Sequence, residues 1–491
     1  MSFVNLVLGW KRIPTVCLII IGAVLGTNSL QGAERVFRAG AYAMEITPPK
    51  YPISVNGGMR DHFATGAHDP LHARCLVLDD GTTKIALVAC DSCMILRPVH
   101  DSAREQATKL TGIPGSNILV SATHTHSAPS SANVFQSDAD PDYMIFLAER
   151  IAAGIAKAHE QLEPAQIGWE VGENPDQVFN RRWKLKPGVT NTDPFDRKTD
   201  VVQMNPGNGN LNKDVPAGPI DPKVTVLSVQ AIDGRPIAAY ANYSLHYVGG
   251  VSGDLVSADY YGVFADLLTQ KIGATQVTPP FVGIMSNGTS GDINNVNYSL
   301  AKLPSRGEFE QIRLVAESVS QTAADAYAKI EYQKWVPLGV AERELQLGVR
   351  KPDANEIVRA EKLVADAKAA GKDQLSTLQE IYARESLKLQ DYPERVPVRL
   401  QAIRIGELGI TAIPCEVFVE IGLELKAMSP FPTTLNVSLA NGYNGYLPTA
   451  QQHSWGGYET WRARSSYLET TAAEKITANL LPMLLELSGS K

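Results

Sequence analysis

The chain is patterned as short apolar runs separated by turns rich in Gly, Pro and Asn. Apolar runs of strand length predict strands at residues 39–47, 75–79, 83–89, 224–231, 237–243, 281–285, 398–405 and 408–413. Apolar residues at helical spacing predict helices at residues 99–110, 142–161, 257–268, 308–330, 414–426 and 471–487. Strands that alternate with helices in this way indicate an α/β fold with mixed β-sheets flanked by helices. The expected core face of the 142–161 helix consists of Ile145, Ala148, Ile151, Ala152 and Ile155.

Two further helices are predicted as an inserted αα-hairpin at about residues 353–390. They span residues 353–370 and 374–389, join at Gly371 and are stopped by Pro393. The segment is rich in Lys, Glu and Ala, which favours a solvated surface hairpin. A lid or a dimer contact are the alternatives.

Residues 174–222 differ from the rest of the chain because Asn, Gly, Pro and charged residues dominate them. We expect a long irregular segment here. Such a segment inside a folded domain is usually functional or disordered.

Composition is that of an ordinary globular protein. The 491 residues are 44% hydrophobic and 20% charged, so a sizeable buried core is expected, and the length alone would allow two to four units. The net charge of −7 argues against a nucleic acid as partner. We find no internal repeat in the sequence.

The N-terminus has the features of an export signal. Lys11 and Arg12 precede the apolar run 13–26, and small residues follow near Gly32 and Ala33. We therefore expect a signal peptide at residues 1–33, a single catalytic domain at 34–491, and a periplasmic or secreted protein. A retained membrane anchor is the alternative, since the run with its flank approaches the roughly 20 residues of a membrane span.

Four cysteines lie beyond this segment, at Cys75, Cys90, Cys93 and Cys415. If Asp80-Gly81 is a two-residue hairpin turn, Cys75 pairs opposite Ala86 and not opposite Cys90. No disulfide framework is recognisable, and the sequence leaves the redox state of the four thiols open.

Two histidines at the end of the strand that begins at Ile118 are the most informative candidates. His124 and His126 are two residues apart, and in a strand such residues point to the same side. They would suit a divalent metal, or one ligand and one acid–base partner. The plainer alternative is a polar strand end, with one histidine hydrogen-bonded and the other solvated.

Polar loops also follow two other predicted strands. One loop contains His246, and the other runs from Ser286 to Asn295. Because binding sites of α/β sheets collect at strand ends, this recurrence favours an enzyme.

Taken together, these motifs resemble the N-terminal catalytic domain of the neutral, non-lysosomal ceramidases. The resemblance runs from Glu45 to Glu459 and rests on five motifs in one order. They are Thr123-His124-Thr125-His126-Ser127-Ala128-Pro129, then His246, then Ser257-Ala258-Asp259, then Pro414-Cys415-Glu416, and finally the spaced tyrosines Tyr446 and Tyr458. The resemblance implies an exported zinc-dependent amidohydrolase that uses metal-activated water to cleave an amide bond of an N-acylated, ceramide-like substrate.

The resemblance also implies roles for individual residues. The implied zinc ligands are His124, His246, Glu416 and Tyr446. The implied catalytic residues are His126, as proton donor to the leaving amine, and Arg181 and Tyr458, which face the scissile amide. Asp292 and Asn294 are candidates for substrate binding. Two histidines with one carboxylate form a common catalytic zinc set, which agrees with this assignment.

The chain departs from the family pattern at Asn294, where the family has a serine that has been proposed as catalytic. An amide cannot act as that nucleophile, so a mechanism through this serine is closed to the chain. We also expect no C-terminal immunoglobulin-like domain, since the sequence stops about where the family's catalytic domain ends.

Two rival functions remain at this point. One is hydrolysis of another amide or ester, such as a glycoconjugate, and the other is a metal-retaining binding protein without turnover. The expected partner is a small amphiphilic or N-acylated molecule, with peripheral membrane contact as a further expectation. The sequence does not indicate an oligomeric state.

Overall fold

The computed structural model describes residues 9–11 and 35–489. Contacts divide the chain into residues 1–35 and 36–491, and the account below concerns the second unit. Apart from residues 9–11, the predicted signal peptide lies outside the described residues, so export stays a prediction. Within the described ranges, every helix is too short or too polar to cross a bilayer.

Three four-stranded units with the same connectivity form the frame, and each is called a sheet below. The first two units join through β1 (Arg38–Glu45) and β8 (Glu163–Glu173) into one eight-stranded sheet, and the third is separate. In the first sheet three consecutive strands run antiparallel, a helix follows, and the fourth strand lies parallel to the third. A second helix then packs against the first one. These elements are β1 (Arg38–Glu45), β5 (His72–Asp79), β6 (Lys84–Cys90), α1 (Arg97–Thr111), β7 (Ile118–Ala122) and α2 (Pro141–Glu160).

The other two sheets repeat this pattern strand for strand. The second consists of β8 (Glu163–Glu173), β13 (Lys223–Ala231), β14 (Pro236–Tyr243), α3 (Asp259–Lys271), β16 (Val282–Asn287) and α4 (Glu310–Tyr327). The third consists of β18 (Leu338–Gly348), β19 (Arg395–Ile405), β20 (Leu408–Ala412), α7 (Val419–Met428), β22 (Thr433–Val437) and α9 (Ala472–Ser488). The expectation that the chain has no internal repeat is therefore wrong at the level of structure.

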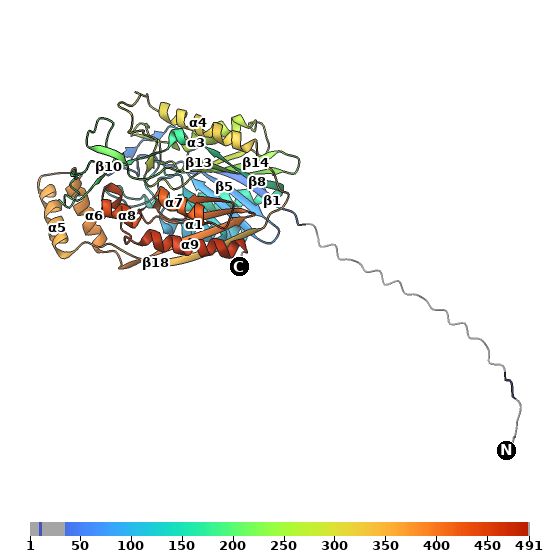
Figure 1. Ribbon diagram of the computed structural model, residues 1–491. Coiled ribbons are helices and arrows are strands. Elements are labelled where there is room, and N and C mark those ends of the chain that lie inside the picture. The colour runs from blue at the N-terminus through green and yellow to red at the C-terminus, as the bar shows by residue number, and fades with distance from the viewer. Residues whose placement is uncertain (1–8, 12–34, 490–491) are drawn as a thin grey trace, which may run out of the picture. The chain divides into compact units, whose positions relative to one another are not determined.

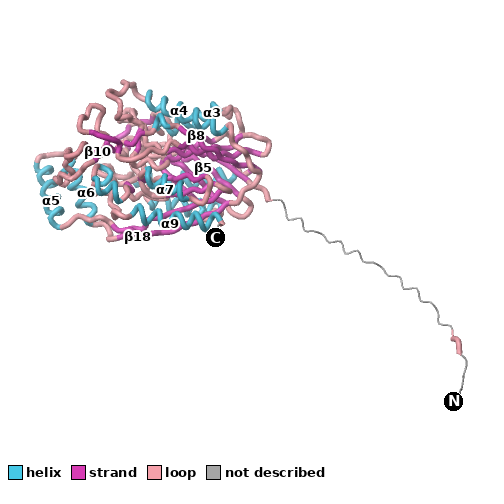
Figure 2. The backbone as a smooth tube through the Cα atoms, viewed as in Figure 1, coloured by secondary structure: helices cyan, strands magenta, loops and turns pink. Residues whose placement is uncertain are grey.

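Alternation along the strands explains how the three sheets pack. On β5, Leu76 and Leu78 belong to a core shared by all three sheets, whereas Cys75 and Val77 face α1 and α2. The same division occurs in the other sheets, whose outer faces pack against α3 with α4 and against α7 with α9. Figure 2 shows the strands in the interior with helices outside them. The α/β expectation is thus confirmed.

A segment is inserted between the first and second strand of every sheet. The first insertion contains β2 (Ile53–Ser54), β3 (Phe63–Ala64) and β4 (Gly66–Ala67). The second contains β9 (Phe179–Asn180), β10 (Arg182–Leu185), β11 (Val202–Met204) and β12 (Lys213–Pro216). The third is the predicted αα-hairpin, α5 (Ala354–Ala369) and α6 (Leu378–Gln390). Figure 1 shows β10, α5 and α6 at the end of this unit opposite the label of β1.

In each sheet, the insertion lies at the same end as the exits of the third and fourth strands. Because the second strand of each sheet is antiparallel to both neighbours, the first and third strands run in the same direction. The fourth strand is parallel to the third, so its carboxyl end emerges there too. The ends of the fourth strands of all three sheets meet, since Ala122 N donates to the Leu439 carbonyl and Ser438 N donates to the Asn287 carbonyl. Sites of α/β proteins are usually found at such strand ends.

Local sequence defines where both helices of the αα-hairpin begin. Asp353 and Glu356 form a capping box at α5, and Thr377 and Glu380 form another at α6. Gly371 joins the helices with φ +74°, a conformation that glycine adopts without strain. Local sequence thus explains why this insertion could be predicted.

Several expectations about the frame are wrong in detail. Residues 174–222 are not wholly irregular, because β11, β10 and β12 form a three-stranded sheet. In α2, Ile145 is 61% exposed, and the buried face of the helix includes Leu147 and Ala158 instead.

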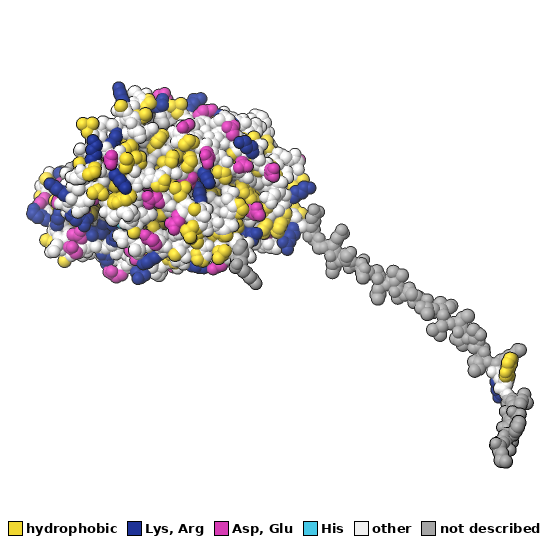
Figure 3. Space-filling model, viewed as in Figure 1, with side chains coloured by type: hydrophobic (Ala, Val, Ile, Leu, Met, Phe, Trp, Pro, Cys, Tyr) yellow, Lys and Arg dark blue, Asp and Glu magenta, His cyan; other side chains and the backbone are white. Residues whose placement is uncertain are grey.

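The surface carries basic, acidic and hydrophobic side chains interspersed on the face that Figure 3 shows.

The hairpin between β5 and β6 also differs from expectation. Its loop has four residues because Asp80 Oδ1 accepts hydrogen bonds from the backbone and hydroxyl of Thr82 and from Thr83 N. Cys75 therefore lies opposite Val88, two residues beyond the expected partner. Ala73, not Cys75, is opposite Cys90. The four cysteines in the described part of the chain are free and buried.

Candidate metal and catalytic site

One loop from each sheet contributes a side chain that could bind a metal ion to a common point. His124 follows β7, His246 follows β14, and Glu416 follows β20. His124 Nε2 lies 3.1 Å from His246 Nε2 and 3.2 Å from Glu416 Oε2. All three side chains are buried, and their donor atoms lie within 4.8 Å of one another. The threefold repeat thus brings together residues that are far apart in the sequence.

The spacing of these atoms fits a tetrahedral metal ion. Zinc bonds of about 2.0–2.1 Å place neighbouring ligand atoms about 3.3 Å apart, close to the separations observed here. Glu416 Oε2 is buried and accepts no geometrically sound hydrogen bond from the described residues. A buried carboxylate oxygen left in this condition is costly, and a cation would satisfy it. The donor set therefore fits zinc.

Hydrogen bonds on the outer side of both imidazole rings fix their orientation. His124 Nδ1 donates to the Cys93 carbonyl at 2.6 Å, and His246 Nδ1 donates to the Ser290 carbonyl at 3.0 Å. A neutral ring that donates through Nδ1 carries its lone pair on Nε2. Both lone pairs therefore face the point between the three ligands, as metal-binding histidines require.

Charges around the cluster shift the pKa values of the two histidines in opposite directions. Burial alone would lower the pKa of His124, but the Glu416 carboxylate outweighs this effect and raises the pKa to about 10. Burial, and then the positive charge of Arg181, lower the pKa of His246 well below its usual value. His124 and Glu416 thus stabilise each other as an ion pair wherever a metal ion does not replace the proton.

The side chains of His124 and His126 converge, although not by strand geometry. Strand β7 ends at Ala122, and His124 has φ +78°, so the expected alternation does not apply. His126 Nε2 nevertheless lies 3.3 Å from His124 Nε2, because the His126 ring stacks on Tyr247 at 3.6 Å. Gly57 confines the ring from another side, since a Cβ there would lie 2.5 Å from it. His126 is therefore fixed at the edge of the cluster.

Arg181 borders the cluster opposite His126. It lies between β9 and β10, and its Nη1 is 3.3 Å from His246 Nε2. Nη2 donates to the hydroxyl of Tyr446 at 3.1 Å, and Nε donates to Glu459 at 2.9 Å. This buried guanidinium thus presents positive charge beside the point between the ligands.

The two predicted tyrosines come from neighbouring segments. Tyr446 begins β23 (Tyr446–Leu447), which pairs with β21 (Glu416–Val417) so that Tyr446 lies directly opposite Glu416. Glu416 was expected to open a helix, but α7 begins only at Val419. Tyr458 starts the short helix η3 (Tyr458–Thr460), and its ring lies 5.8 Å from that of Tyr446.

A pocket with an empty volume of about 300 Å³ opens onto this cluster. It is lined by Gly57, Gly58, Met94, His124, His126, Val134, Phe135, Glu416, Tyr443, Tyr446, Tyr458 and Ser465. The predicted ligands His124 and Glu416 therefore line one pocket. His126 and both predicted tyrosines line the same pocket.

Asp292 and Asn294, the candidates for substrate binding, lie apart from this pocket's lining. Asp292 is buried; its Oδ1 accepts from Val419 N and its Oδ2 accepts from Asn180. Asn294 accepts from Val296 N and donates to Asn205. Both side chains thus bond to neighbouring loops, and the Asp292 carbonyl also accepts from Arg181 N.

Sequence reasoning missed two residues that the structure places beside the site. Tyr443 donates to Glu416 Oε1 at 2.9 Å, which leaves Oε2 facing the histidines. Glu459 is fully buried and accepts from Arg181 at 2.9 Å and from Arg182 at 2.6 Å. In the sequence, only their proximity to the predicted Tyr446 and Tyr458 could have identified these two residues as part of the site.

We expect Tyr443→Phe to weaken zinc binding by about 10- to 100-fold, as removal of a partner that orients a metal ligand usually does. Phenylalanine keeps the ring but removes the donor that holds Glu416. Competition for zinc with a chelator of known affinity measures the change. Tyr382→Phe is the matched control, because the buried Tyr382 hydroxyl has no hydrogen-bond partner among the described residues. Equal zinc affinity in both variants would contradict the role of Tyr443.

Comparison with known proteins identifies relatives for this geometry. A family model described as "Neutral/alkaline non-lysosomal ceramidase, N-terminal" matches residues 37–303, more than half of the chain. Neutral ceramidase B of Dictyostelium discoideum is 24% identical over 54% of this chain and 36% of its own length. The matched region is thus about a third of that relative. Neutral ceramidase of Mycobacterium tuberculosis is 22% identical over 82% of this chain and 70% of its own length.

The fold also matches a solved structure. The crystal structure of neutral ceramidase from Pseudomonas aeruginosa superposes with a TM-score of 0.69 at 18% identity. The match covers 92% of this chain and 75% of that one. At this identity the similarity establishes a shared fold.

Proposed function

Because the chain belongs to the neutral/alkaline non-lysosomal ceramidase family, we propose that it is a zinc-dependent amidohydrolase that cleaves ceramide or a similar N-acylated lipid. The observation that carries this proposal is the convergence of His124, His246 and Glu416 beside a pocket. Zinc bound there would supply Lewis acidity, which activates water and polarises a carbonyl group. Tyr446, which accepts from Arg181 directly beside Glu416, is the fourth candidate ligand.

The remaining side chains would bind the scissile amide and protonate its leaving amine. The Arg181 guanidinium and the Tyr458 hydroxyl are donors next to the ligands, suited to hold the carbonyl oxygen as negative charge develops on it. His126 would deliver a proton to the leaving amine. Burial, and then His124, lower the pKa of His126, so its ring is neutral at neutral pH and would first accept the proton that the attacking water releases before delivering it to the amine. The presence of all three residues argues against a protein that only binds.

A second pocket supports an amphiphilic substrate. It has an empty volume of about 790 Å³ and shares Tyr458 with the pocket at the metal site. Its lining is largely apolar and includes Met59, Val202, Met204, Leu378 and Trp461. An alkyl chain bound there would place its amide near Tyr458. We refer to this space as the apolar pocket.

The test is a hydrolysis screen of the zinc-loaded chain on ceramides, N-acyl amino acids and simple esters of matched chain length. The proposal expects amine release from ceramides to exceed turnover of the other classes. Preference for esters or for N-acyl amino acids would favour the rival hydrolase. Retained zinc without turnover of any class would favour the binding protein.

We expect Tyr458→Phe to lower kcat by about 100-fold, the usual effect of removing one donor to a developing oxyanion. Zinc content should stay unchanged, because the tyrosine is placed as a substrate contact. Steady-state kinetics on the best substrate of the screen, with metal analysis of the same preparation, measures both quantities. An unchanged kcat would remove Tyr458 from the mechanism.

Export remains part of the proposal, through the signal peptide expected at residues 1–33. The test is mass spectrometry of the mature protein from its native host, with cell fractionation. A chain that begins near residue 34 outside the cytoplasm supports export. An intact N-terminus in the membrane fraction supports an anchor.

A further inference from the structure

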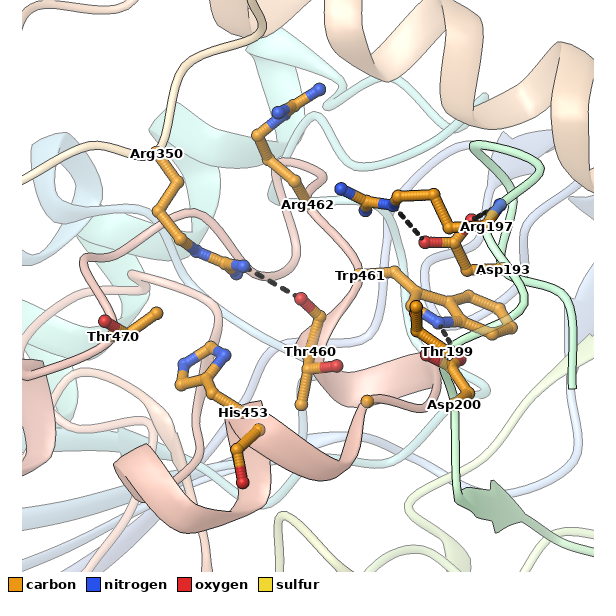
Figure 4. Close-up of a pocket in the computed structure, with 12 residues that line it drawn as sticks. Asp193, Arg197, Thr199, Asp200, Arg350, His453, Thr460, Trp461, Arg462 and Thr470 are labelled. Carbon is orange, nitrogen blue, oxygen red and sulfur yellow. Dashed lines mark hydrogen bonds and ion pairs between the residues drawn. The ribbon is translucent and has the colours of Figure 1, made fainter. Parts of the chain in front are cut away.

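A third pocket lies behind the segment that holds Tyr458 and Glu459, and its lining is rich in arginine. Its empty volume is about 850 Å³. In Figure 4, Arg350 bonds to Thr460 at one side, Arg197 pairs with Asp193 at the other, and Arg462 lies between them in this view. We call this space the arginine pocket.

Arg350 carries a positive charge that no acidic side chain neutralises. Its guanidinium donates only to oxygens without charge, the carbonyls of Leu468, Thr460 and Ser466 and the hydroxyl of Ser466. No carboxylate among residues 35–489 forms an ion pair with it. Burial lowers the pKa of Arg350 to about 10, and the nearby charges of Arg462 and Arg197 add to this lowering. These two neighbours are thus close enough to repel it.

Arg462 is only partly satisfied. Its Nη2 lies 2.9 Å from Glu356 of α5, and its Nη1 donates to the Lys351 carbonyl at 3.3 Å. Its Nε is buried and has no hydrogen-bond partner in the described part of the chain. A buried donor left in this way is unfavourable unless a ligand or water satisfies it.

Acidic groups in the lining do not balance this charge. Asp193 is occupied by Arg197, and Asp200 accepts from the indole of Trp461 at 2.7 Å. The lining therefore holds three guanidinium groups against two carboxylates, and Arg350 is the one of the three without an ion pair among residues 35–489.

We propose that the arginine pocket binds a tetrahedral oxyanion, a phosphate or sulfate group, with Arg350 and Arg462 as its main contacts. Guanidinium groups match such anions in both geometry and charge, and they form paired hydrogen bonds with them. Hydroxyl groups of Thr199 and Thr470 in the lining offer further donors. The anion would offset the repulsion between the arginines.

The phosphate group has two conceivable sources, because neighbouring pockets share lining residues. Trp461 and Asp200 line both the arginine pocket and the apolar pocket. Tyr458 then links the apolar pocket to the metal site, with its ring 6.0 Å from that of Trp461. Free phosphate would fill the arginine pocket alone. A phosphate monoester lipid would extend its chain into the apolar pocket.

The test is calorimetric titration of the full chain with inorganic phosphate, at an ionic strength held constant with chloride. The expected result is saturable binding of about one phosphate per chain. Arg462→Gln should weaken it about tenfold or more, since one charge-assisted contact is lost. Arg462→Lys should lose less phosphate affinity than Arg462→Gln, because lysine keeps the positive charge. Arg235→Gln is the control for the loss of one positive charge. Arg235 lies in the turn between β13 and β14 and forms an ion pair with Glu163 of β8.

Two results would overturn the proposal. One is the absence of saturable phosphate binding by the unaltered chain, and the other is an equal loss in Arg462→Gln and Arg235→Gln. Thermal unfolding checks that each variant is folded. Titration with dihexanoyl phosphatidic acid separates the sources. Binding tighter than that of inorganic phosphate, reduced by Met204→Ser, identifies a lipid, and equal affinities identify the free anion. Neither readout depends on amide hydrolysis, so the proposal can fail independently of the proposed function.

Discussion

His246→Ala should lose both its zinc and its activity, with turnover falling about 1,000-fold or more. The estimate assumes that the metal supplies several kcal/mol of transition-state stabilisation, at about 1.4 kcal/mol for each factor of ten. Alanine removes one of three convergent donors and also leaves Arg181 Nη1 without its neighbour at 3.3 Å. Metal analysis and kinetics on the same preparation measure the two losses.

A suitable control for this variant is His100→Ala, because His100 is buried and bonds to the Ile95 carbonyl outside the site. It removes a buried imidazole and costs stability, but it should keep its zinc. Equal zinc in His246→Ala and the unaltered chain would remove His246 from the metal site.

Glu459→Gln should lower the free energy of unfolding by about 3–5 kcal/mol, the usual cost of breaking a buried ion pair. Glu459 is the shared partner of Arg181 and Arg182, and all three side chains are almost completely buried. The amide cannot neutralise two guanidinium groups, so uncompensated positive charge stays in the interior. Urea unfolding followed by fluorescence measures the change.

Glu344→Gln is the matched control. Its carboxylate is 44% exposed and pairs with Arg97 at the surface, so a loss of less than about 1 kcal/mol is expected. Similar losses in the two variants would contradict the structural role of Glu459. Weakened turnover in Glu459→Gln with unchanged zinc would further show that the carboxylate positions Arg181.

The frame could be predicted where local sequence determines it. Apolar spacing located α1 and α2, and Gly371 with Pro393 located the αα-hairpin. Strand β18 was missed because three consecutive charged residues, 342–344, interrupt its apolar residues and because it is mostly half-buried or exposed. The threefold repeat was not recognisable, because matching positions in the three sheets need only be apolar. Insertions of different length further separate them.

Prediction of the site was limited by long-range contacts. His124, His246, Glu416 and Tyr446 were implied by resemblance, and the structure brings them together. The contact between Arg181 and Glu459 joins residues 278 positions apart, which spacing alone does not reveal. Convergence of His124 with His126 was expected for the wrong reason, since a positive φ rather than strand alternation sets the direction of the first ring.

The most direct test of the account is zinc titration of the metal-free chain, with ceramide hydrolysis as the readout. The account predicts negligible turnover without metal, and activity that rises linearly until about one zinc per chain is bound and then levels off. The same titration of Glu416→Gln should give no such rise. Full ceramide hydrolysis by the metal-free chain would contradict the central claim.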